Sequence, residues 1–375
     1  METTLNIEKN AAKAKRIAVI IDSLAGGGAE KVMLTLASEL VSQGHKVTFF
    51  SLKNTADYEV PSNITLIFPL KTHRGPVRGW FNRKTLANKL KASIDAEQQA
   101  QGEFDLVLVN LYESYRLASA CELKHCFYII HNSYVQELKR EMRMGPVKYF
   151  YMKSILKLLK GKNLIAVSKG VTAELEQTRL FKPASVRHIY NPFDINLIKE
   201  QSKATIESPV PEKFILHVGR AAKAKRHDVL FKALKNVNPE YKLVCLSTNV
   251  KKLNKLSRSL NVEERVVIPG FQSNPYAWMN RAEVVVLSSD FEGLSMVLLE
   301  AIISGTKVVS TNCPHGPSEI MQGQLAQFLV PVQDSDALAM AINSAIDADI
   351  DVSNTPMIAE VSTQQISASY LALID

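Results

Sequence analysis

Two glutamates flank a predicted junction of strand and helix in Phe291-Glu292-Gly293-Leu294-Ser295-Met296-Val297-Leu298-Leu299-Glu300-Ala301. The apolar run 284–287 before them predicts a buried parallel strand, and residues 295–304 predict a helix whose first turn leaves backbone N–H groups free. Glu292 would lie at the carboxyl end of the strand, and Glu300 about one and a half turns into the helix. Both carboxylates could then accept hydrogen bonds from one bound molecule. Helix starts also favour glutamates by about 0.3–1 kcal/mol, so a purely structural role stays open.

The same alternation of short apolar runs with helical patterns continues along the chain. The first series of predicted strands comprises residues 16–21, 46–51, 64–68, 105–110, 126–130 and 164–167. The second series comprises residues 214–219, 241–246, 266–268, 284–287 and 307–310, with helices near 226–236, 250–260, 295–304 and 335–347. This alternation is typical of α/β architecture with parallel sheets.

Prolines and polar residues in 189–194 and 208–211 predict a linker between the two series. We therefore expect residues 1–192 to form a first doubly wound domain, 193–350 a second, and 351–375 a linker and a terminal helix. A length of 375 residues with 46% hydrophobic content suits two globular domains. Ligands of such sheets bind at the carboxyl ends of the strands, so the two domains should face a central cleft.

Several protein classes are not expected from the composition. No stretch approaches the roughly 18–20 uninterrupted apolar residues of a membrane span, and the polar start, residues 1–6, does not resemble a secretory signal. We therefore expect a cytoplasmic protein. The four cysteines have neither the spacing of a metal site nor the density of a disulfide scaffold, and we predict buried or free thiols at Cys121, Cys126, Cys245 and Cys313.

The net charge of +8 is concentrated in residues 1–200, which hold 29 Lys and Arg against 19 Asp and Glu. The segment 71–91, with Trp80-Phe81 in its middle, has several basic residues and no acidic one. In 148–162, a basic helical face is predicted opposite an apolar one. The basic face comprises Lys153, Lys157 and Lys160, and the apolar face Met152, Ile155, Leu156 and Leu159. Such helices suit an anionic membrane surface, and the alternative is a solvated face over an ordinary core. Nucleic acid is not expected, because no recognised binding motif accompanies the charge.

Three glycines follow the first predicted strand, in Asp22-Ser23-Leu24-Ala25-Gly26-Gly27-Gly28-Ala29-Glu30-Lys31. Glycines allow the backbone to approach a ligand closely, and the helix start that follows them favours a phosphate. Gly26 and Gly28 match the first two glycines of a dinucleotide-binding motif, but Lys31 occupies the third position. Phosphate binding at this loop and a simple tight turn both stay open.

The second series begins with a strand that runs into Gly219-Arg220-Ala221-Ala222-Lys223-Ala224-Lys225. Arg220 and Lys225 are placed to converge on negative charge near the strand end, where a diphosphate would fit them. A solvated basic loop is the alternative. Glu292 and Glu300 follow at the same sheet edge, and a carboxylate can accept hydrogen bonds from ribose hydroxyls. Together, these cations and carboxylates predict a nucleotide-sugar site.

His131 directly follows the predicted strand 126–130, so it should lie at the carboxyl edge of the first sheet and could face the cleft. A lone histidine is more often structural than catalytic, and both roles stay open. Asp-x-Asp pairs, which can indicate a site for a metal ion and a diphosphate, occur at 334–336, 347–349 and 349–351. All three lie late in the chain, at a predicted helix start or in the final linker, where helix capping and solvation explain them better. We predict no required metal and no cofactor.

These motifs resemble those of glycosyltransferase family 4, the retaining nucleotide-sugar transferases of GT-B fold. The resemblance spans most of the chain and rests on residues 26–30, His131-Asn132, 166–168, 191–194, Gly219-Arg220 with Lys225, and Glu292 to Glu300 followed by Ala301 and Gly305. The loop 313–320 looks like that of members that build lipopolysaccharide, capsule or lipid-linked oligosaccharides. At Leu294-Ser295 many members carry Phe-Gly or Phe-Pro, so the shape of the sugar pocket stays open.

The resemblance implies that the two domains are Rossmann-like and that the second binds the donor. Its donor-binding residues would be Gly27, Gly28, Arg220, Lys225, Glu292, Gly293, Leu294 and Glu300. Arg220 and Lys225 would hold the diphosphate and Glu300 the ribose. Glu292, with the amides of Gly293 and Leu294, would hold the transferred sugar and its phosphate.

The resemblance further implies that His131 borders the reacting sugar, so that His131 and Glu292 are the catalytic candidates. The N-terminal domain would receive a saccharide or lipid-linked acceptor. The donor would be a UDP-sugar, as is usual in the family. Docked on an anionic membrane, the enzyme would work at the cytoplasmic face of the inner membrane. A nucleotide-sugar epimerase, a sugar-phosphate synthase and an inactive sugar- or lipid-binding module stay open, whereas the missing third glycine argues against a dehydrogenase.

Overall fold

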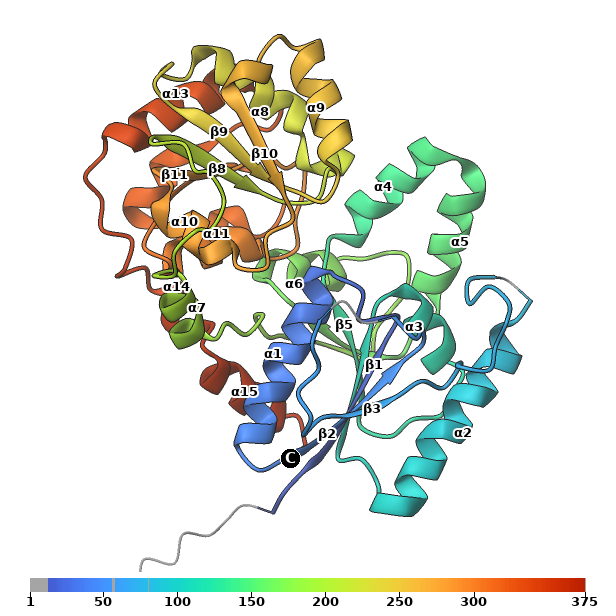
Figure 1. The fold of residues 1–375 in the computed structure, drawn as a ribbon. Helices are drawn as coiled ribbons and strands as arrows, with labels where there is room; N and C mark the ends of the chain where they lie inside the picture. The colour runs from blue at the N-terminus through green and yellow to red at the C-terminus, as the bar shows by residue number, and fades with distance from the viewer. Residues whose placement is uncertain (1–12, 56–57, 80, 375) are drawn as a thin grey trace, which may run out of the picture.

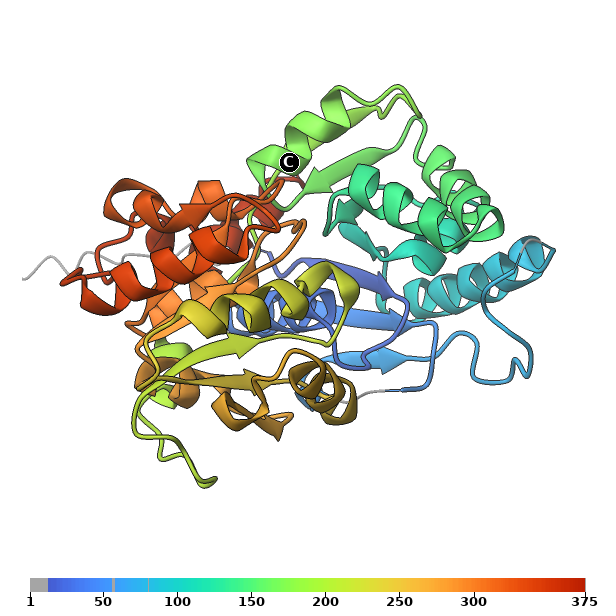
Figure 2. The same cartoon turned by 90° about the horizontal axis from the view of Figure 1, so that it is seen from above.

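The computed structural model describes residues 13–55, 58–79 and 81–374, so the polar start and Trp80 lie outside the described residues. The described residues form two parallel β-sheets, each surrounded by helices (Figure 1). From above, the green and cyan helices of the first domain and the orange and red helices of the second lie on opposite sides of the molecule (Figure 2). The predicted α/β architecture of two doubly wound domains is confirmed.

The first sheet has seven strands in the order β3-β2-β1-β4-β5-β6-β7. They are β1 (Arg16–Ile21), β2 (Lys46–Ser51), β3 (Thr65–Ile67), β4 (Leu106–Asn110), β5 (Cys126–Ile130), β6 (Asn163–Ala166) and β7 (Ser185–His188). The helices are α1 (Gly28–Ser42), α2 (Arg83–Gln101), α3 (Tyr112–Ala118), α4 (Tyr134–Met144), α5 (Pro146–Lys157) and α6 (Lys169–Glu176). The sequence did not predict β7, because this edge strand is short and only partly buried.

The second sheet has six strands in the order β10-β9-β8-β11-β12-β13. They are β8 (Phe214–Val218), β9 (Lys242–Leu246), β10 (Val266–Gly270), β11 (Val284–Leu287), β12 (Lys307–Thr311) and β13 (Leu329–Val330). The helices are α7 (Ile195–Gln201), α8 (His227–Ala233), α9 (Val250–Ser259), α10 (Pro275–Arg281), α11 (Met296–Ile303), α12 (Pro317–Ile320) and α13 (Ser335–Asp347). The C-terminal segment adds α14 (Met357–Glu360) and α15 (Thr363–Leu371). All four residues of β11 are fully buried, which explains their uninterrupted apolar sequence.

The strand order reverses at one place in each sheet. In the first sheet the reversal lies between β1 and β4, and in the second between β8 and β11. Open parallel sheets bind ligands in the crevice outside the carboxyl ends of the strands at such a reversal. The glycine loop follows β1, whereas Arg220 with Lys225 follows β8 and Glu292 follows β11. The fold therefore places the residues singled out in the sequence at these two crevices.

The C-terminal segment returns to the first domain, a contact that the sequence did not predict. It first pairs with the connection between the domains, where the Phe193 N–H donates to the Val361 carbonyl at 2.8 Å. Helix α15 then packs beside α1 (Figure 1), and the Gln43 side chain donates to the Ser367 hydroxyl at 2.8 Å. Two chain segments thus connect the domains side by side.

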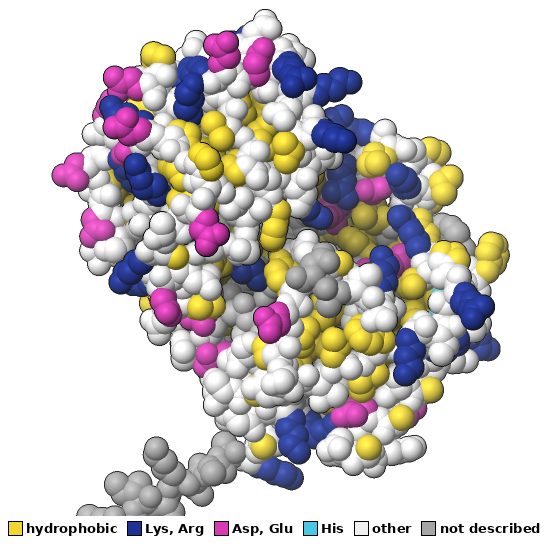
Figure 3. Space-filling view, in the orientation of Figure 1, with side chains coloured by type: hydrophobic (Ala, Val, Ile, Leu, Met, Phe, Trp, Pro, Cys, Tyr) yellow, Lys and Arg dark blue, Asp and Glu magenta, His cyan; other side chains and the backbone are white. Residues whose placement is uncertain are grey.

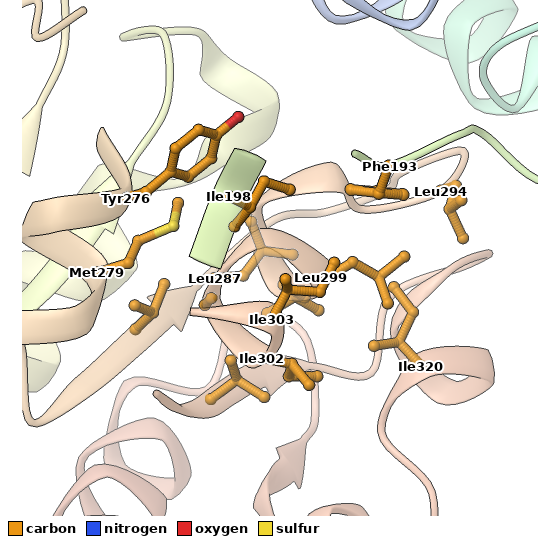
Figure 4. Close-up of a cluster of buried hydrophobic side chains, with 14 of the residues drawn as sticks. Phe193, Ile198, Tyr276, Met279, Leu287, Leu294, Leu299, Ile302, Ile303 and Ile320 are labelled. Carbon is orange, nitrogen blue, oxygen red and sulfur yellow. The ribbon is translucent and has the colours of Figure 1, made fainter. Parts of the chain in front are cut away.

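Helix α11 is apolar on almost every side because it packs against α7, α10 and the strands β11 and β12. Its residues Leu299, Ile302 and Ile303 belong to a buried cluster that also contains Ile198 of α7 (Figure 4). Tyr276 lies at the margin of this cluster, with its hydroxyl pointing away from the apolar side chains. Glu300 therefore extends from a buried helix, and its carboxylate needs polar partners.

The apolar face predicted for 148–162 belongs to the core of the first domain. Its residues Met152, Ile155, Leu156 and Leu159 are buried, so the proposal that this face contacts a membrane is wrong. Among the described residues, no helix combines the length and the apolar character needed to cross a membrane. All four cysteines are free thiols, as predicted.

Candidate functional site

The loop after β8 is fastened to the turn after β11. A single 3-10 turn, Lys223–Lys225, leads to Arg226 in the left-handed conformation with φ 48°. The Arg226 guanidinium contacts the carboxylates of Asp228 at 2.8 Å and Asp290 at 3.2 Å. The Asp290 N–H donates to the Ala224 carbonyl at 2.8 Å. These contacts fix the backbone from which Lys225 reaches the crevice.

Lys225 and Glu292, predicted to converge at one sheet edge, form an ion pair. The Lys225 Nζ lies 2.7 Å from Glu292 Oε1, and the two side chains are 24% and 13% exposed. The Ser288 hydroxyl donates to the Lys225 carbonyl at 2.8 Å. The Glu292 N–H donates to the Pro314 carbonyl at 3.2 Å. Both charged groups therefore stand on fixed backbone at the carboxyl end of β11.

The N-terminus of α11 adds partial positive charge beside this pair. Gly293 and Leu294 form the buried turn before the helix, and Ser295 occupies the cap position. The Ser295 hydroxyl is buried and makes no hydrogen bond to any described residue. Because the first-turn N–H groups of a helix lack partners within the helix, this end of α11 suits an anion.

Arg220 and the glycine loop lie on the two sides of the cleft. Arg220 is exposed, and its charge opposes the rise in pKa that burial causes at the Glu30 carboxyl of α1. Gly27 caps α1, and Gly28 opens the helix with free space where a side chain would lie. In the space-filling view, basic and acidic side chains both line a hollow between the domains (Figure 3).

Glycine is required at position 293 because the two domains touch there. Asn132 and Gly293 form an isolated antiparallel bridge across the cleft. A Cβ atom on Gly293 would overlap the carbonyl oxygen of His131 and would lie 2.8 Å from its carbonyl carbon. This contact brings together the two catalytic candidates, because His131 and Glu292 each neighbour a residue of the bridge.

His131 is held as a neutral imidazole. Burial lowers its pKa to about 4. Its Nε2 lies 2.8 Å from the side-chain oxygen of Asn110, whose amide nitrogen donates to the Leu108 carbonyl at 3.3 Å. The Asn110 oxygen therefore accepts a hydrogen bond from Nε2–H, which leaves Nδ1 as the hydrogen-bond acceptor of the ring.

Glu300 has a partner from the other domain that the sequence did not predict. Its Oε1 lies 2.5 Å from the Nζ of Lys31 in α1 and 3.4 Å from the Tyr276 hydroxyl. Lys31 also donates to the Tyr276 hydroxyl and lies 4.8 Å from the centre of that ring. Burial alone would lower the pKa of Lys31, but Glu300 and Tyr276 raise it well above its usual range.

The loop 313–320 also reaches across the cleft to the first domain. In this loop, His315 has Nε2 2.9 Å from the Glu174 carboxylate of the first domain. The Glu319 carboxylate accepts from the N–H groups of Lys169 at 2.9 Å and Gly170 at 2.8 Å. It thereby satisfies the first N–H groups of α6 from the opposite domain.

A cavity of about 560 Å³ lies within the first domain beside the helical hairpin α4–α5. Its charged lining residues are Asp22, Lys53, Arg78, Glu113, Arg140 and Glu141. Asp22 accepts from the Ser114 N–H and hydroxyl, both at 2.7 Å, and burial raises its pKa to about 6. The sequence analysis did not predict this cavity, and the position of Asp22 at the end of β1, next to the glycine loop, is the signal that could have indicated it. Among the described residues, no group of three or more His, Cys, Asp or Glu side chains could hold a metal ion.

Two stretches of the chain match known families. Residues 26–197 match the family described as Glycosyltransferase Family 4. Residues 198–357 match the family described as Glycosyl transferases group 1. The two matches meet between the two sheets and together span most of the chain.

Individual relatives extend this similarity. The N-acetylgalactosamine-N,N'-diacetylbacillosaminyl-diphospho-undecaprenol 4-alpha-N-acetylgalactosaminyltransferase of Campylobacter jejuni is 27% identical over 347 residues, covering 89% of this chain and 91% of that protein. The lipopolysaccharide 1,6-galactosyltransferase of Salmonella typhimurium is 27% identical over 198 residues, covering 50% of this chain and 53% of that protein. The structure of Anabaena HepE in complex with UDP-glucose superimposes with a TM-score of 0.72 at 20% identity, covering 95% of this chain and 98% of that chain. The fold is therefore shared over nearly the whole chain.

The Gly293 contact leads to a test of how the domains fit together. Gly293→Ala would place a methyl group against the His131 carbonyl, so the domains must separate to accommodate it. We expect a larger radius of gyration in small-angle X-ray scattering than for the native protein. Gly28→Ala is the matched control, because its added methyl group meets open space. Native scattering from Gly293→Ala would contradict this close contact in solution.

Proposed function

The chain belongs to the glycosyltransferases of the family 4 type with the GT-B fold, and we propose that it transfers a sugar from a UDP-sugar to a lipid-linked saccharide with retention of anomeric configuration. The observation that carries this proposal is the Lys225–Glu292 pair beside the N-terminus of α11, at the strand reversal of the second sheet. Named activities of the relatives, on a diphospho-undecaprenol acceptor and in lipopolysaccharide synthesis, support the acceptor class.

Charge in the second domain supports a nucleoside diphosphate donor. Arg220, Lys225 and the first-turn amides of α11 would bind the diphosphate, and Glu300 would accept hydrogen bonds from the ribose. When the donor enters, the Lys225 ammonium turns from Glu292 toward the phosphates. Glu292 then becomes an acceptor for hydroxyls of the transferred sugar, beside the amides of Gly293 and Leu294.

The proposed reaction occurs on one face of the sugar. The bond between the anomeric carbon and the phosphate oxygen breaks as the acceptor hydroxyl attacks from the same side, and a donor phosphate oxygen takes the hydroxyl proton. Arg220, Lys225 and α11 offset the charge that develops on the leaving UDP, so preorganised electrostatics supply most of the rate enhancement. His131, neutral and with Nδ1 as an acceptor, would orient a hydroxyl of the sugar.

These same cations make a metal ion unnecessary in the proposed mechanism. With two basic side chains and a helix N-terminus around the diphosphate, its charge is already compensated. We therefore propose that the enzyme needs neither a metal nor another cofactor.

The acceptor would bind in the 560 Å³ cavity of the first domain. Lys53, Arg78 and Arg140 supply positive charge there, and the Arg78 guanidinium lies 4.6 Å from the centre of the Tyr151 ring. Cationic groups next to aromatic and aliphatic surface suit a saccharide joined to a phosphate group. Asp22 and Glu113 offer acceptors for sugar hydroxyls.

The tip of the α4–α5 hairpin supports docking on the cytoplasmic face of an anionic membrane. The hairpin projects from the first domain (Figure 1), and four large apolar side chains at its tip are exposed: Met142, Met144, Val147 and Phe150. Three basic residues accompany them: Lys139, Arg143 and Lys148. Near anionic headgroups, each basic residue contributes about 1 kcal/mol. Docking by this tip would place the lipid carrier close to the acceptor cavity, because the lining residues Glu141 and Tyr151 adjoin the tip residues Met142 and Phe150.

Donor binding tests the proposed site directly. Lys225→Ala and Glu300→Ala should each weaken UDP binding at least about tenfold in calorimetry, because a hydrogen bond to a charged group contributes about 1.5–3 kcal/mol. Lys223→Ala is the matched control, since it removes an exposed cation from the same loop. Unchanged UDP affinity in both folded variants would overturn the assignment.

Stereochemistry and metal dependence test the mechanism. With an α-linked UDP-sugar identified by screening, NMR of the product should show an α-glycosidic bond, and excess EDTA should leave the transfer rate unchanged. A β-linked product would contradict retention, and activity lost with EDTA and restored by a divalent ion would contradict the metal-free mechanism. Release of an epimerised sugar would instead favour an epimerase, and transfer of the sugar to a sugar phosphate would favour a sugar-phosphate synthase.

Flotation with liposomes tests the docking surface. The fourfold variant with Met142, Met144, Val147 and Phe150 each changed to Ser should lose binding to vesicles rich in phosphatidylglycerol, which the native protein should bind. Met340→Ser, which removes an exposed apolar side chain from α13, is the control. Equal flotation of the native protein with neutral and anionic vesicles, or native-like binding by the fourfold variant, would contradict docking by the hairpin tip.

A further inference from the structure

We propose that Lys31 of the first domain is a positioning residue for the donor: it holds the Glu300 carboxylate across the cleft so that one of its oxygens stays free for the ribose. The inference rests on the proposed function, because it concerns how Glu300 binds the donor. Lys31 stands where a dinucleotide-binding motif would carry its third glycine. The residue that departs from that motif would thus position Glu300 for the donor.

The contacts at Glu300 divide its two oxygens unequally. Oε1 accepts from the Lys31 ammonium at 2.5 Å and lies 3.4 Å from the Tyr276 hydroxyl. No described residue donates a hydrogen bond to Oε2. A carboxylate can accept about four hydrogen bonds, so Oε2 retains capacity for ribose hydroxyls while Oε1 is held.

The burial of Glu300 explains why Lys31 would stay in place when the donor binds. The Glu300 side chain is 7% exposed, and burying a carboxylate without a cation beside it is costly. Ribose hydroxyls are neutral and cannot supply that charge. The diphosphate would bind the other nearby cations, Arg220 and Lys225. Lys31 is therefore the counter-ion of Glu300 with the site empty or occupied.

Lys31 is itself held in place for this role. Its ammonium lies 4.8 Å from the centre of the Tyr276 ring and donates to the hydroxyl of the same residue. Its backbone N–H donates to the Gly27 carbonyl at 3.2 Å within the first turn of α1. Because α1 belongs to the first domain and Glu300 to the second, this geometry exists only when the two domains are close. Ribose recognition and domain closure therefore depend on the same ion pair.

Comparison of UDP with 2′,3′-dideoxy-UDP isolates the ribose contribution. By calorimetry, the native protein should bind UDP about tenfold more tightly than the dideoxy compound, as expected for hydrogen bonds to a charged group. In Lys31→Met this ratio should fall to about one, whereas Lys31→Arg should keep most of it, because a guanidinium can make the same ion pair. Loss of overall stability alone would change both affinities and leave their ratio intact.

Two further variants complete the experiment. Lys213→Met is the matched control, because it breaks an exposed ion pair with Glu240 within the second domain and should keep the native ratio. Lys31→Gln, which removes the charge but keeps a donor, replaces Lys31→Met if that variant does not fold. A native ratio in folded Lys31→Met or Lys31→Gln would overturn the role of Lys31. Failure of the native protein itself to bind UDP, or to distinguish it from the dideoxy compound, would overturn the proposed donor site and this inference with it.

Discussion

Gly293 and His131 meet so closely across the cleft that no side chain fits between them, and the rest of the site depends on this contact. It joins the turn before α11 to the end of β5 and fixes how near the two sheet edges come to each other. At that separation, Lys31 reaches Glu300 and the 313–319 loop reaches α6. A wider cleft would leave several of these buried polar groups without partners, which is costly in a protein interior.

The charged residues of the cleft follow one electrostatic rule, that a buried ion needs a partner. Glu292 is paired with Lys225 inside the second domain, and Glu300 is paired with Lys31 across the domains. A nucleotide sugar offers both kinds of group at once, a diphosphate for cations and hydroxyls for carboxylates. The diphosphate can therefore take Lys225 from Glu292, which frees Glu292 for sugar hydroxyls. The ribose hydroxyls can bind Glu300 while Lys31 keeps its contact with the same carboxylate. The same set of charges explains binding and, in the proposed mechanism, stabilisation of the leaving group.

The sequence was sufficient to predict the fold and one half of the candidate site. The spacing of apolar residues and their short uninterrupted runs predicted the central strands. Because parallel strands bring their carboxyl ends to one edge of a sheet, Lys225 and Glu292 could be expected to meet. The edge strand β7 was missed because its half-exposed residues lack an apolar run. The contacts of Lys31 and His315 were missed for a different reason. They join separate domains, and no local pattern encodes how two domains are placed relative to each other.

A crystal structure of the protein with UDP would test most directly whether these charges form the donor site. We predict ribose hydroxyls within hydrogen-bonding distance of Glu300, with the Lys31 ion pair retained, and the diphosphate against Arg220, Lys225 and the first turn of α11. A diphosphate bound instead in the glycine loop of the first domain, with Glu300 away from the nucleotide, would contradict this assignment.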